Sequence, residues 1–82
     1  MKNEKGLHDK TIEILGTQLA NAEVKHPVFC KSNEHAVTII TEELGELAQA
    51  VLDEESKELL IEEAAHVAVT AIRFIEELIK ND

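Results

Sequence analysis

The chain has 82 residues, enough for one small domain, which we expect to span residues 1–82. Leu, Ile, Val and Phe fill 25 positions, too many for a disordered chain, while one Pro and three Gly exclude a β-sandwich built on frequent turns. The net charge is −9, and residues 32–82 carry 13 acids against three basic residues. Such a surface excludes nucleic acid and anionic membrane as partners, because no cationic stripe can replace their counterions.

The first helix is predicted from about residue 7 to 25, after a frayed start at residues 1–6. Its apolar residues recur with the 3-4-3 spacing of one helix face and are Ile12, Leu15, Leu19 and Ala22. Pro27 ends this helix at or before His26, because the residue before proline is pushed out of the α region. We expect Val28 and Phe29, in the connection that follows, to plug the core.

Two further helices are predicted, from about residue 33 to 52 and from about 57 to 79. Ser32 or Asn33 caps the second helix, and the acidic break at residues 53–55 with Ser56 ends it and caps the third. The apolar stripe of the second helix consists of Val37, Ile40, Leu44, Leu47 and Val51. That of the third consists of Ile61, Ala65, Ala68, Ile72, Ile75 and Ile79.

These elements predict an all-α fold of antiparallel helices that form a bundle. A helical chain this short often completes its core with a second copy of itself, so we expect a homodimer or homotetramer. Cys30 is the only cysteine and cannot form an intrachain disulfide. No segment has the length of a membrane span and the N-terminus lacks a signal-peptide core, so the expected location is the cytoplasm.

Acidic residues occupy positions where the second helix should be apolar. Glu43 has Ile39 and Ile40 one turn before it and Leu47 one turn after it. A lone carboxylate is costly to desolvate, so this position favours a partner for the charge. Glu42 and Glu46 lie toward the same side of the helix.

The third helix repeats the pattern with Glu63 and, three residues later, His66. If the second and third helices pack antiparallel through the turn at residues 53–56, Glu43 and Glu46 lie at the height of Glu63 and His66. Oxygen- and nitrogen-bearing side chains that face one another inside a bundle are how helical proteins build divalent metal sites. The alternative is that these acids belong to solvated helix faces, as most acidic residues of such helices do.

The run Glu42-Glu43-Leu44-Gly45-Glu46 resembles the EExxE motif of the MazG-like all-α nucleoside triphosphate pyrophosphohydrolases. Glu63-Ala64-Ala65-His66 follows after sixteen residues, where that family has ExxD, and the pair His26-Pro27 also resembles shorter members. The resemblance covers about residues 18–79.

The resemblance implies a Mg²⁺-dependent enzyme that cleaves a nucleoside or deoxynucleoside triphosphate to the monophosphate and pyrophosphate. It implies Glu43, Glu46, Glu63 and His66 as the metal-binding positions, and Glu42 as a catalytic acid that joins the ligands or orients the attacking water. Arg73 is a candidate contact to the substrate phosphates, with a surface ion pair to Glu76 or Glu77 as the other interpretation.

His66 departs from the family pattern, because imidazole is a poor ligand of Mg²⁺ and suits Mn²⁺ or another transition metal better. One reading is an active variant with a changed metal preference. The other is that a protonated His66 takes the place of the cation, which leaves a catalytically impaired helical module that acts in self-association or partner binding. A third reading, a relative of phosphoribosyl-ATP pyrophosphatase, shares the acidic helices but fits the stretch from His26 to Leu47 less well.

Overall fold

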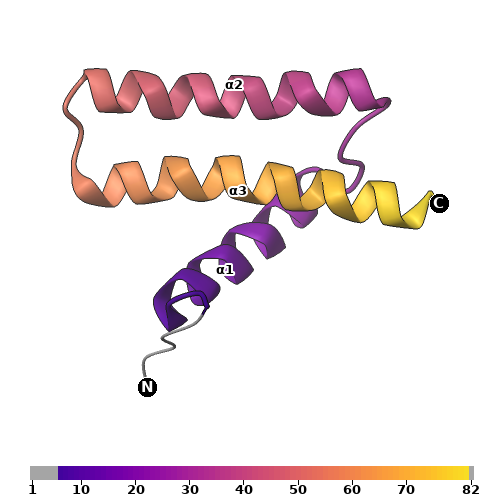
Figure 1. Cartoon of the computed structure of the whole chain (residues 1–82), viewed down its shortest axis with the longest axis horizontal. Coiled ribbons are helices and arrows are strands. Elements are labelled where there is room, and N and C mark those ends of the chain that lie inside the picture. The colour runs from indigo at the N-terminus through magenta and orange to yellow at the C-terminus, as the bar shows by residue number, and fades with distance from the viewer. Residues whose placement is uncertain (1–5, 82) are drawn as a thin grey trace.

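The computed structural model describes residues 6–81 and contains three helices, α1 (Asp9–Lys25), α2 (Asn33–Leu52) and α3 (Lys57–Lys80), with no strand in that range (Figure 1). The all-α expectation is therefore confirmed. The expected frayed start lies outside the described residues except for Gly6, which is exposed. Between residues 6 and 81, none of the helices combines the length and apolar character needed to cross a membrane.

Helices α2 and α3 form an antiparallel hairpin, and α1 packs against α3 and runs away from the hairpin at an angle (Figure 1). The helix ends lie within two residues of the predicted ones. Ser32 Oγ accepts a hydrogen bond from the His35 backbone N–H at 3.0 Å, and Ser56 Oγ accepts one from Leu59 at 3.1 Å. Helix α1 ends at Lys25, two residues before Pro27. Local sequence thus sets the ends of all three helices.

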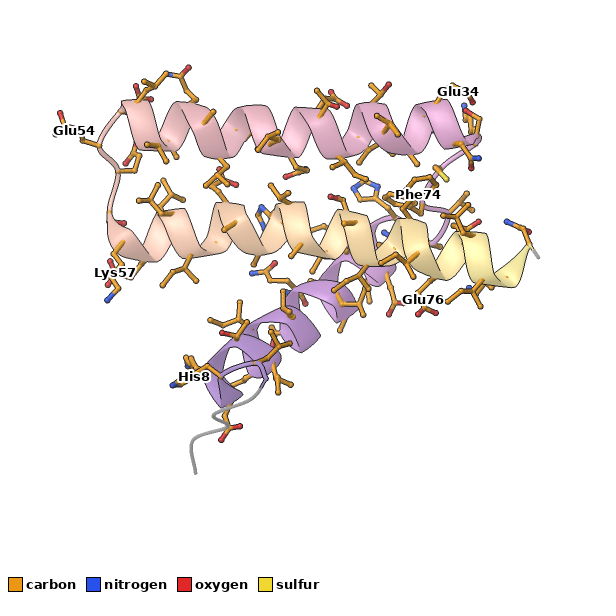
Figure 2. All side chains as sticks on the ribbon, viewed as in Figure 1. His8, Glu34, Glu54, Lys57, Phe74 and Glu76 are labelled. Atoms are coloured by element: carbon orange, nitrogen blue, oxygen red, sulfur yellow. The ribbon has the colours of Figure 1, made fainter. Side chains whose placement is uncertain are left out.

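The turn between α2 and α3 is closed by two backbone hydrogen bonds. The Glu55 N–H donates to the Ala50 carbonyl and the Glu54 N–H donates to the Val51 carbonyl, each at 3.1 Å. This is the Schellman pattern, in which the residue after the helix cap adopts the left-handed conformation. Glu54 occupies that position with φ 53° and projects away from the hairpin (Figure 2). Glycine is the usual residue there, so the acidic turn forms at some cost in backbone strain.

The core of the single chain is small. Its buried apolar residues are Phe29, Ala36, Ala50, Ala65 and Val69, and Arg73 is the one buried charged residue in the described part of the chain. Three of the five apolar members are alanines, and α1 contributes none. Phe29 plugs the core as expected, whereas Val28 is 76% exposed, so that half of the prediction is wrong.

The predicted apolar stripes are only partly covered. On α2, Ile40 and Leu47 are half-buried, but Val37, Leu44 and Val51 are exposed. On α3, Ala65 is buried, while Ile61, Ile75 and Ile79 are exposed. The periodicity therefore identified apolar helix faces, but parts of those faces stay exposed in the single chain.

Candidate metal centre

Glu43 of α2 and Glu63 and His66 of α3 converge between the two helices. One ligand atom from each lies within 4.8 Å of the other two. His66 Nδ1 lies 3.1 Å from Glu63 Oε1, at hydrogen-bond distance, and 3.8 Å from Glu43 Oε2. The three side chains that the sequence placed at one height of the hairpin are thus in contact.

The antiparallel hairpin and the helix period together produce this cluster. Glu63 and His66 are three residues apart and lie on one face of α3, which meets Glu43 across the helix pair. The side chains of Glu43, Glu63 and His66 are 26%, 17% and 35% exposed. These side chains are therefore partly buried and have polar partners, and part of each stays accessible to solvent. A ligand site needs this intermediate exposure.

The negative charges of the cluster affect one another. The pKa of Glu43 is raised, first by its partial burial and then by the nearby charge of Glu46, with smaller contributions from Glu63 and Glu42. His66 acts in the opposite direction and lowers the pKa of Glu43. A positive group at this position, whether an imidazolium or a metal cation, relieves the repulsion among the carboxylates.

Glu46 and Glu42 take a more peripheral place than the resemblance implied. Both are exposed, and neither belongs to the group of ligand atoms within 4.8 Å of one another in the described part of the chain. Their charges nevertheless reach Glu43 and raise its pKa. Their roles as a metal ligand and as a catalytic acid stay predictions.

Two members of the cluster form part of the wall of a cavity of about 450 Å³ between the three helices. Glu43 and His66 line one part of it, and Lys25 and Arg73 line another. Phe29 adds an apolar surface to the wall. A cavity of this volume falls within the range of small-molecule sites, which combine apolar walls with a few polar groups.

Helix α1 supplies a side of this cavity that sequence reasoning missed. Gln18, Asn21 and Lys25 line the cavity at spacings of three and four residues, the period of one helix face. That polar face was present in the sequence beside the apolar stripe of α1. Its place beside Glu43 and His66 depends on the angle between α1 and α3, which no local pattern encodes.

Arg73 lines the cavity but already has partners. Its guanidinium donates to the carbonyl of Ala22 at 3.2 Å and to that of His26 at 2.5 Å, and its central carbon lies 5.3 Å from the centre of the Phe29 ring. It is 9% exposed, so the expected surface pair with Glu76 or Glu77 is not formed. Arg73 instead joins the end of α1 to α3, and its contact to a phosphate stays a prediction.

The donor set suits a divalent transition metal better than Mg²⁺. Two carboxylates and one imidazole provide three ligands, and imidazole favours Mn²⁺, Co²⁺, Ni²⁺ or Zn²⁺. With three protein ligands, further coordination positions remain for water or substrate oxygens. The residues present therefore fit a bound cation, with a preference shifted by His66.

Comparison with family models, with curated proteins and with solved structures found no match to this chain. The resemblance to MazG-like enzymes accordingly depends on the sequence motifs around Glu43 and Glu63 alone.

Proposed function

We propose that this protein is a metal-dependent nucleotide pyrophosphohydrolase that cleaves a nucleoside or deoxynucleoside triphosphate to the monophosphate and pyrophosphate. The observation that carries the proposal is the convergence of Glu43, Glu63 and His66 between α2 and α3, with Glu43 and His66 on the wall of the cavity between the helices. Acids from two helices that meet beside a cavity are the arrangement expected of a cation site that receives a polyphosphate.

In this proposal Glu43, Glu63 and His66 hold the cation, Mg²⁺ or Mn²⁺, and Glu46 completes the ligand set. A bound divalent cation supplies charge neutralisation for the phosphate oxygens and lowers the pKa of water. Glu42, exposed beside the cluster, orients the attacking water. The cavity wall formed by α1 and Phe29 holds the nucleoside part and excludes water from it.

A cytoplasmic location belongs to the same proposal. It is supported by the single cysteine, Cys30, which suits a reducing compartment. Nucleoside triphosphates, the proposed substrates, are also found in that compartment.

The experiment measures pyrophosphate release from a panel of nucleoside and deoxynucleoside triphosphates, with Mg²⁺ or Mn²⁺, by the wild-type chain and by Glu43→Gln. We expect turnover with at least one substrate, higher with Mn²⁺, and a loss of about 100-fold or more in Glu43→Gln, because a metal ligand is removed. Glu62→Gln is the matched control, since Glu62 is an exposed acid beside Glu63 on α3. Turnover that survives Glu43→Gln, or that falls equally in Glu62→Gln, contradicts the proposal.

The second candidate is a catalytically impaired helical module, which a specific contact favours. The His66–Glu63 hydrogen bond and the nearby Glu43 allow a protonated His66 to neutralise the carboxylates without a metal. Calorimetric titration with Mn²⁺ and Mg²⁺ separates the two functions. Binding that is lost in Glu43→Gln favours the enzyme, whereas no binding of either metal together with no pyrophosphate release favours the module.

A further inference from the structure

Arg73 carries a buried charge that no carboxylate among residues 6–81 neutralises, although the chain has 17 acidic residues. It is 9% exposed, and its guanidinium donates to the backbone carbonyls of Ala22 and His26. These carbonyls use two of its five N–H groups but carry no net charge. Buried charges are normally paired, because removing an unpaired charge from water is costly. Since Arg73 lines the cavity, an anion bound there would supply the missing charge.

The surroundings of Arg73 leave part of its guanidinium for a ligand. The guanidinium carbon lies over the Phe29 ring, 5.3 Å from its centre, so the ring occupies one side of the group. After the two carbonyl bonds, three N–H groups remain. The planar fork of an arginine matches the oxygen atoms of a phosphate or a carboxylate. The guanidinium can therefore hold an anion and the end of α1 at the same time.

Two further nitrogen donors line the same cavity. One is Lys25, an exposed residue in the last turn of α1. The other is His35, in the first turn of α2, whose Nδ1 accepts a hydrogen bond from the Lys31 backbone N–H at 3.0 Å. An imidazole whose Nδ1 accepts a hydrogen bond carries its proton on Nε2, so the remaining polar atom of His35 is a donor. We call Lys25, His35 and Arg73 the donor cluster.

The donor cluster lies away from the acidic residues of the cavity. Arg73 follows His66 by seven residues on α3, which is about 10 Å along the helix axis. His35 precedes Glu43 by eight residues on α2, which is about 12 Å. Because the two helices are antiparallel, both displacements lead toward the same end of the hairpin (Figure 1). The cavity is therefore acidic at one end and rich in donors at the other.

These donors suit a terminal phosphate group, which carries about −1.5 to −2 charges at neutral pH and several acceptor oxygens. Such a group can accept hydrogen bonds from three helices at once. A neutral ligand would leave the charge of Arg73 without a partner, and a metal cation would be repelled by it. The separation of about 10–12 Å from Glu43 and His66 also means that a cation held there binds a different part of the ligand.

We propose that Lys25, His35 and Arg73 form a subsite that binds a terminal phosphate group without a metal ion. The inference deepens the proposed function and rests on it for the identity of the ligand as a nucleotide. Two phosphate groups of a nucleotide share the required chemistry. One is the last phosphate of the triphosphate chain, and the other is a phosphate on the ribose.

Titration of the wild-type chain with sodium phosphate in EDTA, followed by NMR, tests the subsite without a nucleotide or a metal. We expect saturable shifts of the Arg73 guanidinium N–H groups and of the amides around Lys25 and His35. Lys25→Gln should weaken binding by about 5-fold or more, because a charged donor is lost. Lys31→Gln is the matched control, since it removes the same charge from an exposed position that does not line the cavity. It should change the affinity by less than about 2-fold.

A second variant, His35→Asn, removes the Nε2 donor but retains an acceptor for the Lys31 N–H. It should also weaken phosphate binding by about 5-fold, with unchanged helical circular dichroism. No saturable binding up to about 100 mM phosphate overturns the subsite, as do equal losses in Lys25→Gln and Lys31→Gln or an unchanged affinity in His35→Asn. These outcomes involve no turnover, so failure of the subsite is distinguishable from failure of the proposed function.

Nucleotides distinguish the two sources of the phosphate group. Calorimetry in EDTA compares a nucleoside 5′-diphosphate with its 5′-triphosphate and with its 3′-phosphorylated 5′-diphosphate, for each common base. If Lys25→Gln weakens the triphosphate more than the diphosphate, the subsite holds the last phosphate of the chain. If it weakens the 3′-phosphorylated compound more, the subsite holds a ribose phosphate. Equal effects on all three compounds, or no binding of any of them, overturn the assignment of the subsite to the substrate.

Discussion

Arg73 holds α1 in place beside the cavity, and its replacement tests how the site is assembled. Helix α1 has no buried residue, so its position depends on few contacts, and the guanidinium bonds to the carbonyls of Ala22 and His26 are two of them. In Arg73→Met both hydrogen bonds and the contact with the Phe29 ring are lost, while an apolar side chain of similar length still fills the space.

The size of the effect follows from these three contacts. A hydrogen bond to a charged group contributes about 1.5–3 kcal/mol, and a cation over an aromatic ring contributes about 0.5–1 kcal/mol. The two carbonyls lie at a helix end, where water can replace part of the lost bonding. We therefore expect Arg73→Met to reduce the free energy of unfolding by about 2–4 kcal/mol. Arg73→Lys should lose about half as much, because an ammonium group is a single point donor that cannot match the planar fork.

Urea unfolding at a fixed protein concentration measures this change, and hydrogen exchange locates it. The amides of residues 9–25 should exchange faster in Arg73→Met, while those of α2 keep their relative protection. Lys80→Met is the control, since it removes a positive charge from an exposed position near the end of the same helix. A loss in Arg73→Met below about 0.5 kcal/mol, or unchanged exchange in α1, would refute the role assigned to Arg73.

Three further predictions concern single positions. The pKa of Glu43 is raised in the folded chain, so folding favours the protonated carboxyl group. The stability that this group contributes is present below pH 4.5, the ordinary carboxyl pKa, and is lost as the pH rises through the raised pKa. Glu43→Gln should therefore gain stability relative to the wild type between pH 4 and pH 7 in EDTA, as measured by thermal unfolding at each pH. Glu54→Gly should increase the free energy of unfolding in urea by about 0.5–1 kcal/mol, because glycine adopts the left-handed conformation without strain. Ser56→Ala should reduce the free energy of unfolding by about 1 kcal/mol, because the N-cap hydrogen bond of α3 is lost. Ser56→Asp should retain most of this stability, because an aspartate side chain can also cap the helix.

The elements of the fold were predictable because their causes are local. Pro27 ends α1, Ser32 and Ser56 cap the next two helices, and each acts on residues within one turn of itself. The positions of Glu43 and His66 relative to each other were predictable for a similar reason. A short turn fixes the register of an antiparallel hairpin, so equal counts from the turn give equal heights.

The remaining features depend on contacts between distant segments. Arg73 donates hydrogen bonds to the carbonyls of His26 and Ala22, which lie 47 and 51 residues away in the sequence. Every residue has a backbone carbonyl, so the sequence does not indicate which one Arg73 contacts. The cavity depends on the angle of α1 in the same way. Periodicity showed that Leu44 and Ile75 lie on apolar faces, but it could not show that no helix of the same chain covers them.

The faces of α3 explain how a chain of this size can carry both a polar cluster and an uncovered apolar surface. One face presents Glu63 and His66 to α2, and another presents Val69 and Arg73 toward the cavity and α1. The face with Ile61 and Ile75 stays uncovered. A polar cluster between two helices reduces the number of apolar contacts in a small core, because carboxylates occupy positions that leucines would otherwise fill.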